Sequence, residues 1–157
     1  MRFLFYDSIT RIEKGKDVTG IKTFSLSEEF LRGHFTKEAL VPGVIFIEAM
    51  AQLLGWLVIY THDFTLSPIL TLVEGAHVPS RLRPGFKAEI YGQITSTSKR
   101  DTLGAAAMFI DGEKVASANR IIYSHFDKID PGELYRRFCY YSGLKEQIPW
   151  ISQTKKG

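Results

Sequence analysis

Apolar and polar residues follow two different patterns along this chain. In six segments they alternate or favour β-strand residues, and turn signals such as KGKD, RLRPGF and DGE separate several of these segments. The remaining long segment, residues 43–60, is apolar at nearly every position, which is typical of a buried helix. The expected strands cover residues 5–13, 18–26, 69–78, 86–98, 102–111 and 114–125.

The apolar segment decides the predicted fold class. A helix that is apolar on nearly all sides needs cover on nearly all sides, and an antiparallel sheet curled around it supplies that cover. Pro42 stands at the first helical position, where proline is best tolerated. We therefore predict an α+β fold in which a six-stranded antiparallel sheet wraps a long central hydrophobic helix. The segment is nearly long enough to span a membrane, but Glu48 and Gln52 near its middle favour a core helix.

The C-terminal part of the chain predicts a second helix of a different kind. Asp130 is an expected N-cap, Pro131 the first helical residue and Glu133 the partner in a capping box. The apolar residues Leu134, Phe138 and Tyr141 then fall on one face. We expect a domain over residues 1–126 and a helical extension over residues 127–157, packed on the sheet or on a neighbouring subunit.

Composition is ordinary for a globular protein and limits the classes of partner that the protein is expected to bind. The chain is 45% hydrophobic and 24% charged, with a net charge of +3, which is too weakly basic to indicate nucleic acid. Cys139 is the single cysteine, so no disulfide framework or cysteine metal site is expected. The N-terminus lacks the pattern of a signal peptide. These features favour a reducing, cytoplasmic location.

One carboxylate interrupts the apolar helix. Glu48, Gln52 and Gly55 follow helical spacing and share a face, so Gln52 can orient the acid and Gly55 leaves room beside it. Burial favours the neutral form of a carboxyl group, which can then donate a proton near neutral pH. The alternative is a structural glutamate paired with an arginine or a backbone group. Taken alone, the pattern leaves both interpretations open.

A histidine and a helix start supply the other parts of a proton-transfer site. His34 lies fourteen positions before Glu48 and can act as a base near pH 7. Between them Pro42 and Gly43 start the helix, where unpaired backbone N–H groups can hold a developing negative oxygen. Base, acid and oxyanion donor in one short segment favour chemistry beside a carbonyl group.

These residues resemble a known family. GHFTKEALVPGVIFIEAMAQ, residues 33–52, is similar to the signature of the (3R)-3-hydroxyacyl-acyl-carrier-protein dehydratases, and the likeness extends over about residues 5–125. Glu48 resembles the acid of the dehydratase-only Z type, where the dehydratase-isomerase A type has aspartate. The positions in register are Gly33, His34, Phe35, Pro42, Gly43, Val44, Glu48, Ala49, Met50, Ala51 and Gln52.

The resemblance implies a hot-dog fold. It also implies the reaction of this family in fatty-acid biosynthesis, which is the removal of water from a 3-hydroxyacyl chain. By likeness, His34 would remove a proton from C2 of the acyl chain and Glu48 would protonate the leaving 3-hydroxyl. The Gly43 amide would bind the thioester oxygen, and Gln52 would hold Glu48. Val44 and Phe35 would line the substrate site.

The resemblance also implies partners. Family members work as homodimers, often as three dimers together, with each active site shared between two subunits. The substrate arrives on the phosphopantetheine arm of acyl carrier protein, and no metal or redox cofactor takes part. Arg81, Arg83 and Lys87 are candidate docking residues for that acidic carrier, although solvated turn charges are the simpler interpretation.

The signature departs from the family pattern in the loop before the helix. Thr36 and Ala39 replace two prolines, and Glu38 stands where the family often has histidine. Loss of proline frees the loop. If Glu38 faces His34, its charge would favour the protonated imidazole and weaken it as a base. These departures suggest a relative specialised for an unusual acyl chain or a polyketide pathway.

Other functions on the same fold are also considered. An acyl-thioester hydrolase usually relies on a helix acid and water, so His34 favours elimination over hydrolysis. A non-catalytic module that binds the carrier or the acyl chain is a second alternative. A structural subunit of a larger synthase is a third.

Overall fold

The structure is a computed structural model that describes residues 3–33 and 37–144. His34, Phe35 and Thr36, three of the residues discussed above, lie outside the described residues. The elements are β1 (Ser8–Glu13), β2 (Asp17–Phe24), η1 (Glu29–Leu31), α1 (Gly43–Thr61), β3 (Ser67–His77), β4 (Phe86–Thr97), β5 (Asp101–Ile110), β6 (Glu113–Phe126) and α2 (Pro131–Ser142).

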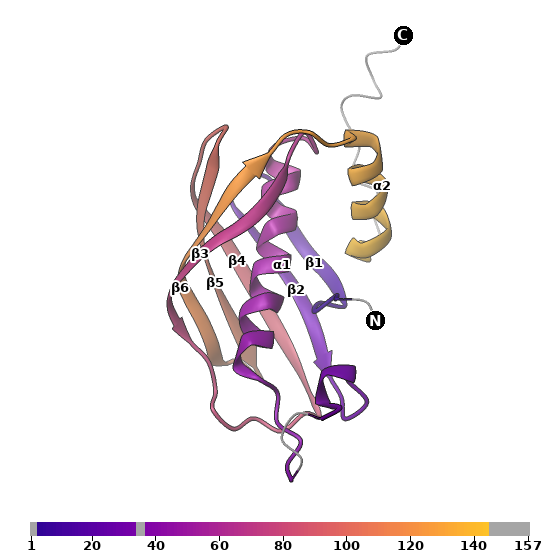
Figure 1. The fold of residues 1–157 in the computed structure, drawn as a ribbon, viewed down its shortest axis with the longest axis vertical. Helices are drawn as coiled ribbons and strands as arrows, with labels where there is room; N and C mark the ends of the chain where they lie inside the picture. The colour runs from indigo at the N-terminus through magenta and orange to yellow at the C-terminus, as the bar shows by residue number, and fades with distance from the viewer. Residues whose placement is uncertain (1–2, 34–36, 145–157) are drawn as a thin grey trace.

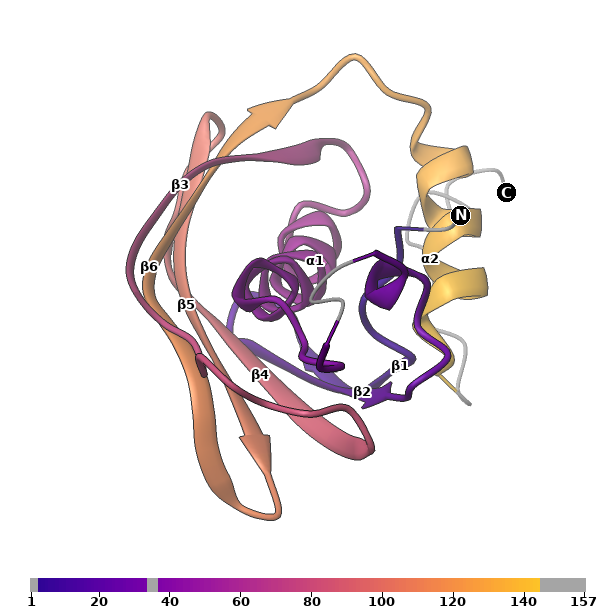
Figure 2. The ribbon, with the colours of Figure 1, turned by 60° about the horizontal axis from the view of Figure 1, so that its bottom comes forward.

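The six strands form one antiparallel sheet in the order β1-β2-β4-β5-β6-β3. The sheet curves around α1, as the view in Figure 2 shows, while α2 stands on the opposite side of α1 from β5 and β6 (Figure 1). The predicted α+β fold and the predicted order of elements are confirmed. This is the hot-dog fold.

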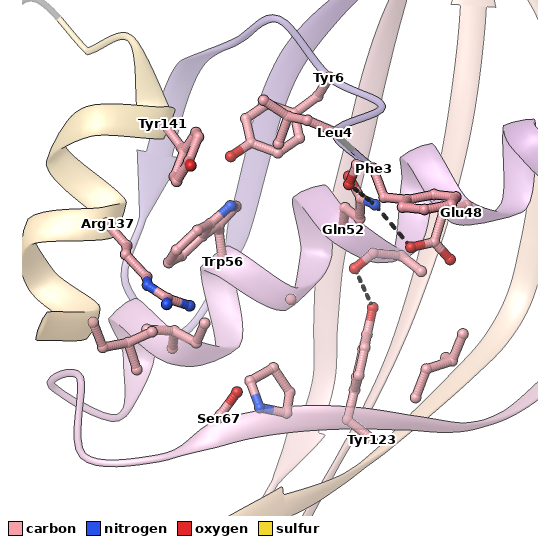
Figure 3. A pocket seen from close by; sticks show the side chains of 16 residues that line it. Phe3, Leu4, Tyr6, Glu48, Gln52, Trp56, Ser67, Tyr123, Arg137 and Tyr141 are labelled. Carbon is pink, nitrogen blue, oxygen red and sulfur yellow. Dashed lines mark hydrogen bonds between the residues drawn. The ribbon is translucent and has the colours of Figure 1, made fainter. Parts of the chain in front are cut away.

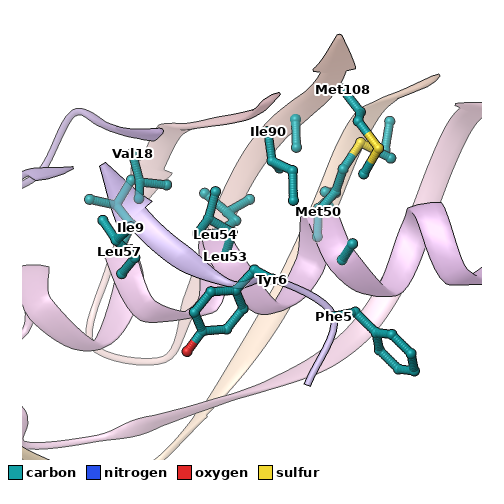
Figure 4. Packing of buried hydrophobic residues seen from close by; sticks show 14 of the residues in the cluster. Phe5, Tyr6, Ile9, Val18, Met50, Leu53, Leu54, Leu57, Ile90 and Met108 are labelled. Atoms are coloured by element: carbon teal, nitrogen blue, oxygen red, sulfur yellow. The ribbon is translucent and has the colours of Figure 1, made fainter. Parts of the chain in front are cut away.

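α1 lies in the core because the sheet covers its apolar surface. Its length and composition would suffice to cross a membrane, but 61% of its most apolar stretch is buried inside the protein. Figure 4 shows its side chains packed against those of the strands. The residues of α1 that are buried are Phe46, Ala49, Met50, Ala51, Leu53, Leu54, Gly55, Leu57, Val58 and Ile59.

Gly104 on β5 is one of the glycines that let the sheet approach α1 closely. A methyl group at Gly104 would lie 2.8 Å from Leu54 Cδ2 and 2.6 Å from the Gln93 carbonyl oxygen. Both distances are shorter than real contacts of a side chain allow, so the inner face of the sheet needs a residue without a side chain here. This close packing of helix and sheet positions α1, which carries the residues of the site described below.

α2 begins at the local signals expected of it and ends at a glycine. The Asp130 carboxylate accepts hydrogen bonds from the N–H groups of Gly132 (2.8 Å) and Glu133 (3.2 Å). Gly143 ends the helix in the left-handed conformation with φ of 64°. The predicted N-cap and first residue, Pro131, are confirmed. The Glu133 side chain pairs with Arg137 one turn later (2.9 Å).

α2 is held against α1 by Phe138. This side chain is 1% exposed, and its ring packs on Trp56 (5.5 Å between centroids), Phe64 (5.4 Å) and Tyr60 (6.1 Å, stacked). The extension was expected to pack on the sheet or on a second subunit. α2 packs beside strand β1 of the sheet, as the first of these alternatives predicts, and also on the C-terminal half of α1 of the same chain.

Candidate active site

Glu48 projects from the first half of α1 and is held by a chain of hydrogen bonds (Figure 3). Gln52 Nε2 donates to Glu48 Oε1 at 2.8 Å, as the helical spacing predicts. Gln52 is itself fixed by the segment before β1: its Nε2 donates to the Phe3 carbonyl oxygen (3.0 Å), and its Oε1 accepts from the Phe5 N–H (2.9 Å). Gln52 therefore orients the carboxyl group.

The same contacts determine which carboxyl oxygen is available for chemistry. An amide NH₂ group only donates, so Glu48 Oε1 must act as an acceptor. A proton on this acid therefore belongs on Oε2. Among the described residues, no arginine, lysine or backbone group pairs with Glu48, which removes the main support for a purely structural glutamate.

A pocket of about 600 Å³ adjoins this acid. Four parts of the chain besides α1 contribute to it: the segment before β1, β3, β6 and α2. Gly55 lines it, and a methyl group there would touch only Pro68 at 3.7 Å, so the predicted room beside Glu48 is confirmed. The lining residues are Phe3, Leu4, Tyr6, Glu48, Ala51, Gln52, Gly55, Trp56, Ile59, Ser67, Pro68, Leu70, Tyr123, Leu134, Arg137 and Tyr141.

Tyr123 forms a wall of the pocket that the sequence pattern did not reveal. Its side chain is 2% exposed, and its hydroxyl donates to the Ala51 carbonyl oxygen at 2.7 Å. Burial raises the pKa of the Tyr123 phenol well above its usual value, and the nearby Glu48 charge raises it further. Tyr123 therefore stays neutral and braces α1 one turn after the acid.

The helix start lies apart from the pocket. Gly43 is the first helical residue and Pro42 the flanking N-cap, one position from the prediction. A methyl group at Gly43 would lie 2.7 Å from Val78 Cγ2, so the loop after β3 requires a glycine here. Val44 is 65% exposed. Gly43 and Val44 do not line the pocket, and Gly43 precedes Glu48 by about 7 Å of helix rise.

The predicted docking residues differ in their surroundings. Arg81 forms an ion pair with Glu38, the residue that departs from the family signature. Glu38 therefore has a cationic partner of its own. Arg83 is exposed and donates to the neighbouring Pro84 carbonyl oxygen (3.4 Å), and Lys87 is exposed at the start of β4. None of the three basic residues lines the pocket.

Comparison with known proteins identifies the family. A model described as the FabA-like domain matches residues 1–119. The chain belongs to the FabA-like domain family. It is 34% identical over 124 residues to the 3-hydroxyacyl-[acyl-carrier-protein] dehydratase FabZ of Thiobacillus denitrificans, covering 74% of this chain and 83% of that protein. It is 31% identical over 118 residues to the FabZ of Bacillus cytotoxicus, covering 74% of this chain and 81% of that protein.

Solved structures share the fold of this FabA-like chain. A Streptococcus mutans protein bound to acetyl CoA superposes with a TM-score of 0.61 at 13% identity, over 79% of this chain and 91% of its own. A thioesterase from Haemophilus influenzae superposes with a TM-score of 0.60 at 7% identity, over 78% of this chain and 79% of its own. At such identities the likeness concerns the fold alone. The family match ends inside β6, so α2 lies beyond the matched domain.

Proposed function

We propose that this protein is a 3-hydroxyacyl-acyl-carrier-protein dehydratase of the Z type, a lyase acting in fatty-acid or related acyl-chain biosynthesis. The observation that carries the proposal is Glu48, oriented by Gln52 and with no partner for Oε2 among the described residues, beside a pocket in a FabA-like domain. The named relatives, at 31–34% identity, support the same reaction.

In the proposed reaction the elements of water leave C2 and C3 of the acyl chain. His34 takes the proton from C2, the electron pair forms the C2–C3 double bond, and Glu48 delivers its Oε2 proton to the departing 3-hydroxyl. The Gly43 N–H stabilises the thioester oxygen as negative charge develops there. Phe35 and Val44 flank the substrate. The roles of His34 and Phe35 rest on the sequence signature, since both lie outside the described residues.

The proposal includes a homodimer formed through β3. β6 pairs with one edge of β3, and the described chain offers no strand to the other edge. Ile69, Leu70 and Leu72 are 53%, 37% and 43% exposed along it. An exposed apolar edge strand is a template for pairing with another chain. A dimer would bring His34 of one subunit to Glu48 of the other, and three such dimers are a further expectation.

The substrate is proposed to arrive on the phosphopantetheine of acyl carrier protein in the cytoplasm, without a metal or redox cofactor. Arg83 and Lys87 are exposed and available to an acidic carrier. Arg81 is a weaker candidate because Glu38 already binds its guanidinium.

The test is product analysis by mass spectrometry with (3R)-3-hydroxyacyl thioesters on acyl carrier protein. We expect wild type to form the enoyl product, and His34→Ala and Glu48→Gln to lower kcat by about 10²- to 10⁴-fold. Glu89→Gln, an exposed position on β4, is the matched control and should retain activity. Free acid as the product would replace the proposal with thioester hydrolysis. Tight substrate binding without any product would replace it with a binding module.

A further inference from the structure

The pocket continues well beyond the acid. From Glu48 it follows α1 to Trp56, about 12 Å of helix rise, and reaches Leu134, Arg137 and Tyr141 of α2. Figure 3 shows Glu48 and Gln52 at one end, and Tyr6, Trp56, Arg137 and Tyr141 at the other. The α2 residues of this end wall lie beyond the part of the chain that the family model matches.

The shape of the pocket gives the direction of a bound acyl chain. On the proposed function, Glu48 meets the 3-hydroxyl at one end of the pocket. The rest of the acyl chain then extends toward Trp56 and α2. The distal end of a sufficiently long chain therefore meets the α2 end of the pocket.

A buried hydroxyl at this end has no hydrogen-bond partner within residues 3–33 and 37–144. Tyr6 is 1% exposed and lines the pocket, yet its phenol makes no hydrogen bond to any described residue. Burial raises the pKa of this phenol far above its usual value. The Trp56 N–H faces the oxygen and partly offsets that rise, without the geometry of a full hydrogen bond. A buried donor without an acceptor is costly, so Tyr6 offers an O–H to a ligand.

Arg137 adds a charged donor to the same end. One of its nitrogens pairs with Glu133 at 2.9 Å, but a guanidinium carries five N–H groups, so others remain for the pocket. The packing of Phe138 on α1 fixes the helix that presents Arg137. Glu48 is the one carboxylate among the lining residues, and it lies at the opposite end.

We infer that Tyr6, Trp56 and Arg137 form a distal subsite that prefers acyl chains ending in an oxygen acceptor, a hydroxyl or carboxylate, over chains ending in a methyl group. This inference rests on the proposed function for the direction of the chain. The donors of the subsite gain an acceptor, whereas a methyl end leaves the Tyr6 hydroxyl unsatisfied. A carboxylate end would also pair with Arg137.

Calorimetric binding of saturated acyl-pantetheine thioesters to the full-length protein tests the subsite without requiring turnover. Ligands of matched length end in methyl, hydroxyl or carboxylate, and a short series ends before Trp56. We expect wild type to bind the long oxygen-ended ligands about fivefold or more tightly than the methyl-ended ligand. The short series should show no preference for the end group.

Substitutions then assign the preference to side chains. Tyr6→Phe should reduce the preference for both oxygen ends by about fivefold, whereas Arg137→Leu should reduce chiefly the carboxylate preference. Tyr140→Phe and Arg136→Leu change exposed side chains of α2 and should leave all affinities unchanged. The inference would be overturned if wild type bound long oxygen-ended and long methyl-ended ligands with equal affinity. It would also be overturned if the preference for oxygen ends survived in both Tyr6→Phe and Arg137→Leu. A protein that shows the preference but dehydrates nothing would keep the subsite and disprove the proposed reaction.

Discussion

The two helices that line the pocket are stabilised in opposite ways. α1 has 19 residues and no side-chain cap at its start, and it is held by the sheet around it. α2 has 12 residues, a carboxylate N-cap, a glycine C-cap and one buried aromatic anchor, Phe138. The acid end of the pocket is therefore part of the global core, whereas the distal end depends on a helix docked from outside. The two ends should respond separately to substitution.

The largest effect is expected in α1. Phe46 is fully buried and packs on Phe24 at 5.7 Å between ring centroids. We expect Phe46→Ala to lower the free energy of unfolding of the whole protein by about 3–5 kcal/mol, because it removes a large core side chain and leaves a cavity. Urea denaturation measures this. Val44→Ala, at an exposed position of the same helix, should change it by less than about 0.5 kcal/mol.

Phe138→Ala should act more locally. Removing this anchor costs about 3 kcal/mol of packing, but α2 can detach while the sheet and α1 stay folded. Hydrogen exchange should therefore become much faster in α2 and change little in α1. Tyr140→Ala, at a position that is 69% exposed on α2, is the control. Equal acceleration of exchange in both helices would show that α2 belongs to the same cooperative unit as the core.

A smaller effect is expected at the start of α2. Asp130→Ala removes the acceptor for the Gly132 and Glu133 N–H groups and should destabilise the helix by about 1 kcal/mol. Asp130→Asn keeps an acceptor at this position and should destabilise the helix much less. Exchange rates of the first-turn amides distinguish the two variants. Identical rates in both would mean that the cap contributes little here.

The smallest effect concerns the C-terminal end of α1 and depends on pH. His62 and His125 are linked through the hydroxyls of Thr97 and Thr102, with successive distances of 2.8, 2.6 and 2.8 Å. Burial lowers the pKa of both histidines, and for His62 the neighbouring His125 lowers it further. The unfolded chain, with ordinary histidine pKa values near 6.5, then binds more protons than the folded protein.

The free energy of unfolding should therefore have its full value above about pH 6.5. It should decrease as the pH drops through the lowered pKa values of the two histidines. Urea midpoints measured from pH 7.5 to pH 5 test this. His125→Gln should flatten the dependence, whereas His77→Gln, at an exposed position, should not. The same pH dependence in wild type and His125→Gln would rule out this origin.

Local pattern predicted the elements well but predicted few of the contacts between them. The apolar run predicted α1 to within a residue, Asp130 and Pro131 predicted the start of α2, and spacing placed Gln52 beside Glu48. Each of these signals lies within a few residues of the feature it marks.

The missed features join residues that are distant in sequence. Tyr6, Tyr123 and Arg137 reach the pocket from three separate parts of the chain, and no periodicity marks such a meeting. Likewise, Arg81 looked like a free turn charge, but Glu38 lies 43 residues earlier and binds it. Contacts of this kind depend on the folded sheet and not on the local pattern.

The central claim is that Glu48 is the acid and that Gln52 acts through it. A double-mutant cycle on kcat for enoyl formation, with Glu48→Gln, Gln52→Leu and the double variant, tests this most directly. Circular dichroism and thermal unfolding monitor the fold, because Gln52 also binds the Phe3 and Phe5 backbone. We expect Gln52→Leu to lower kcat about tenfold in wild type and to cause no further loss in Glu48→Gln. Equal losses in both backgrounds would contradict the account.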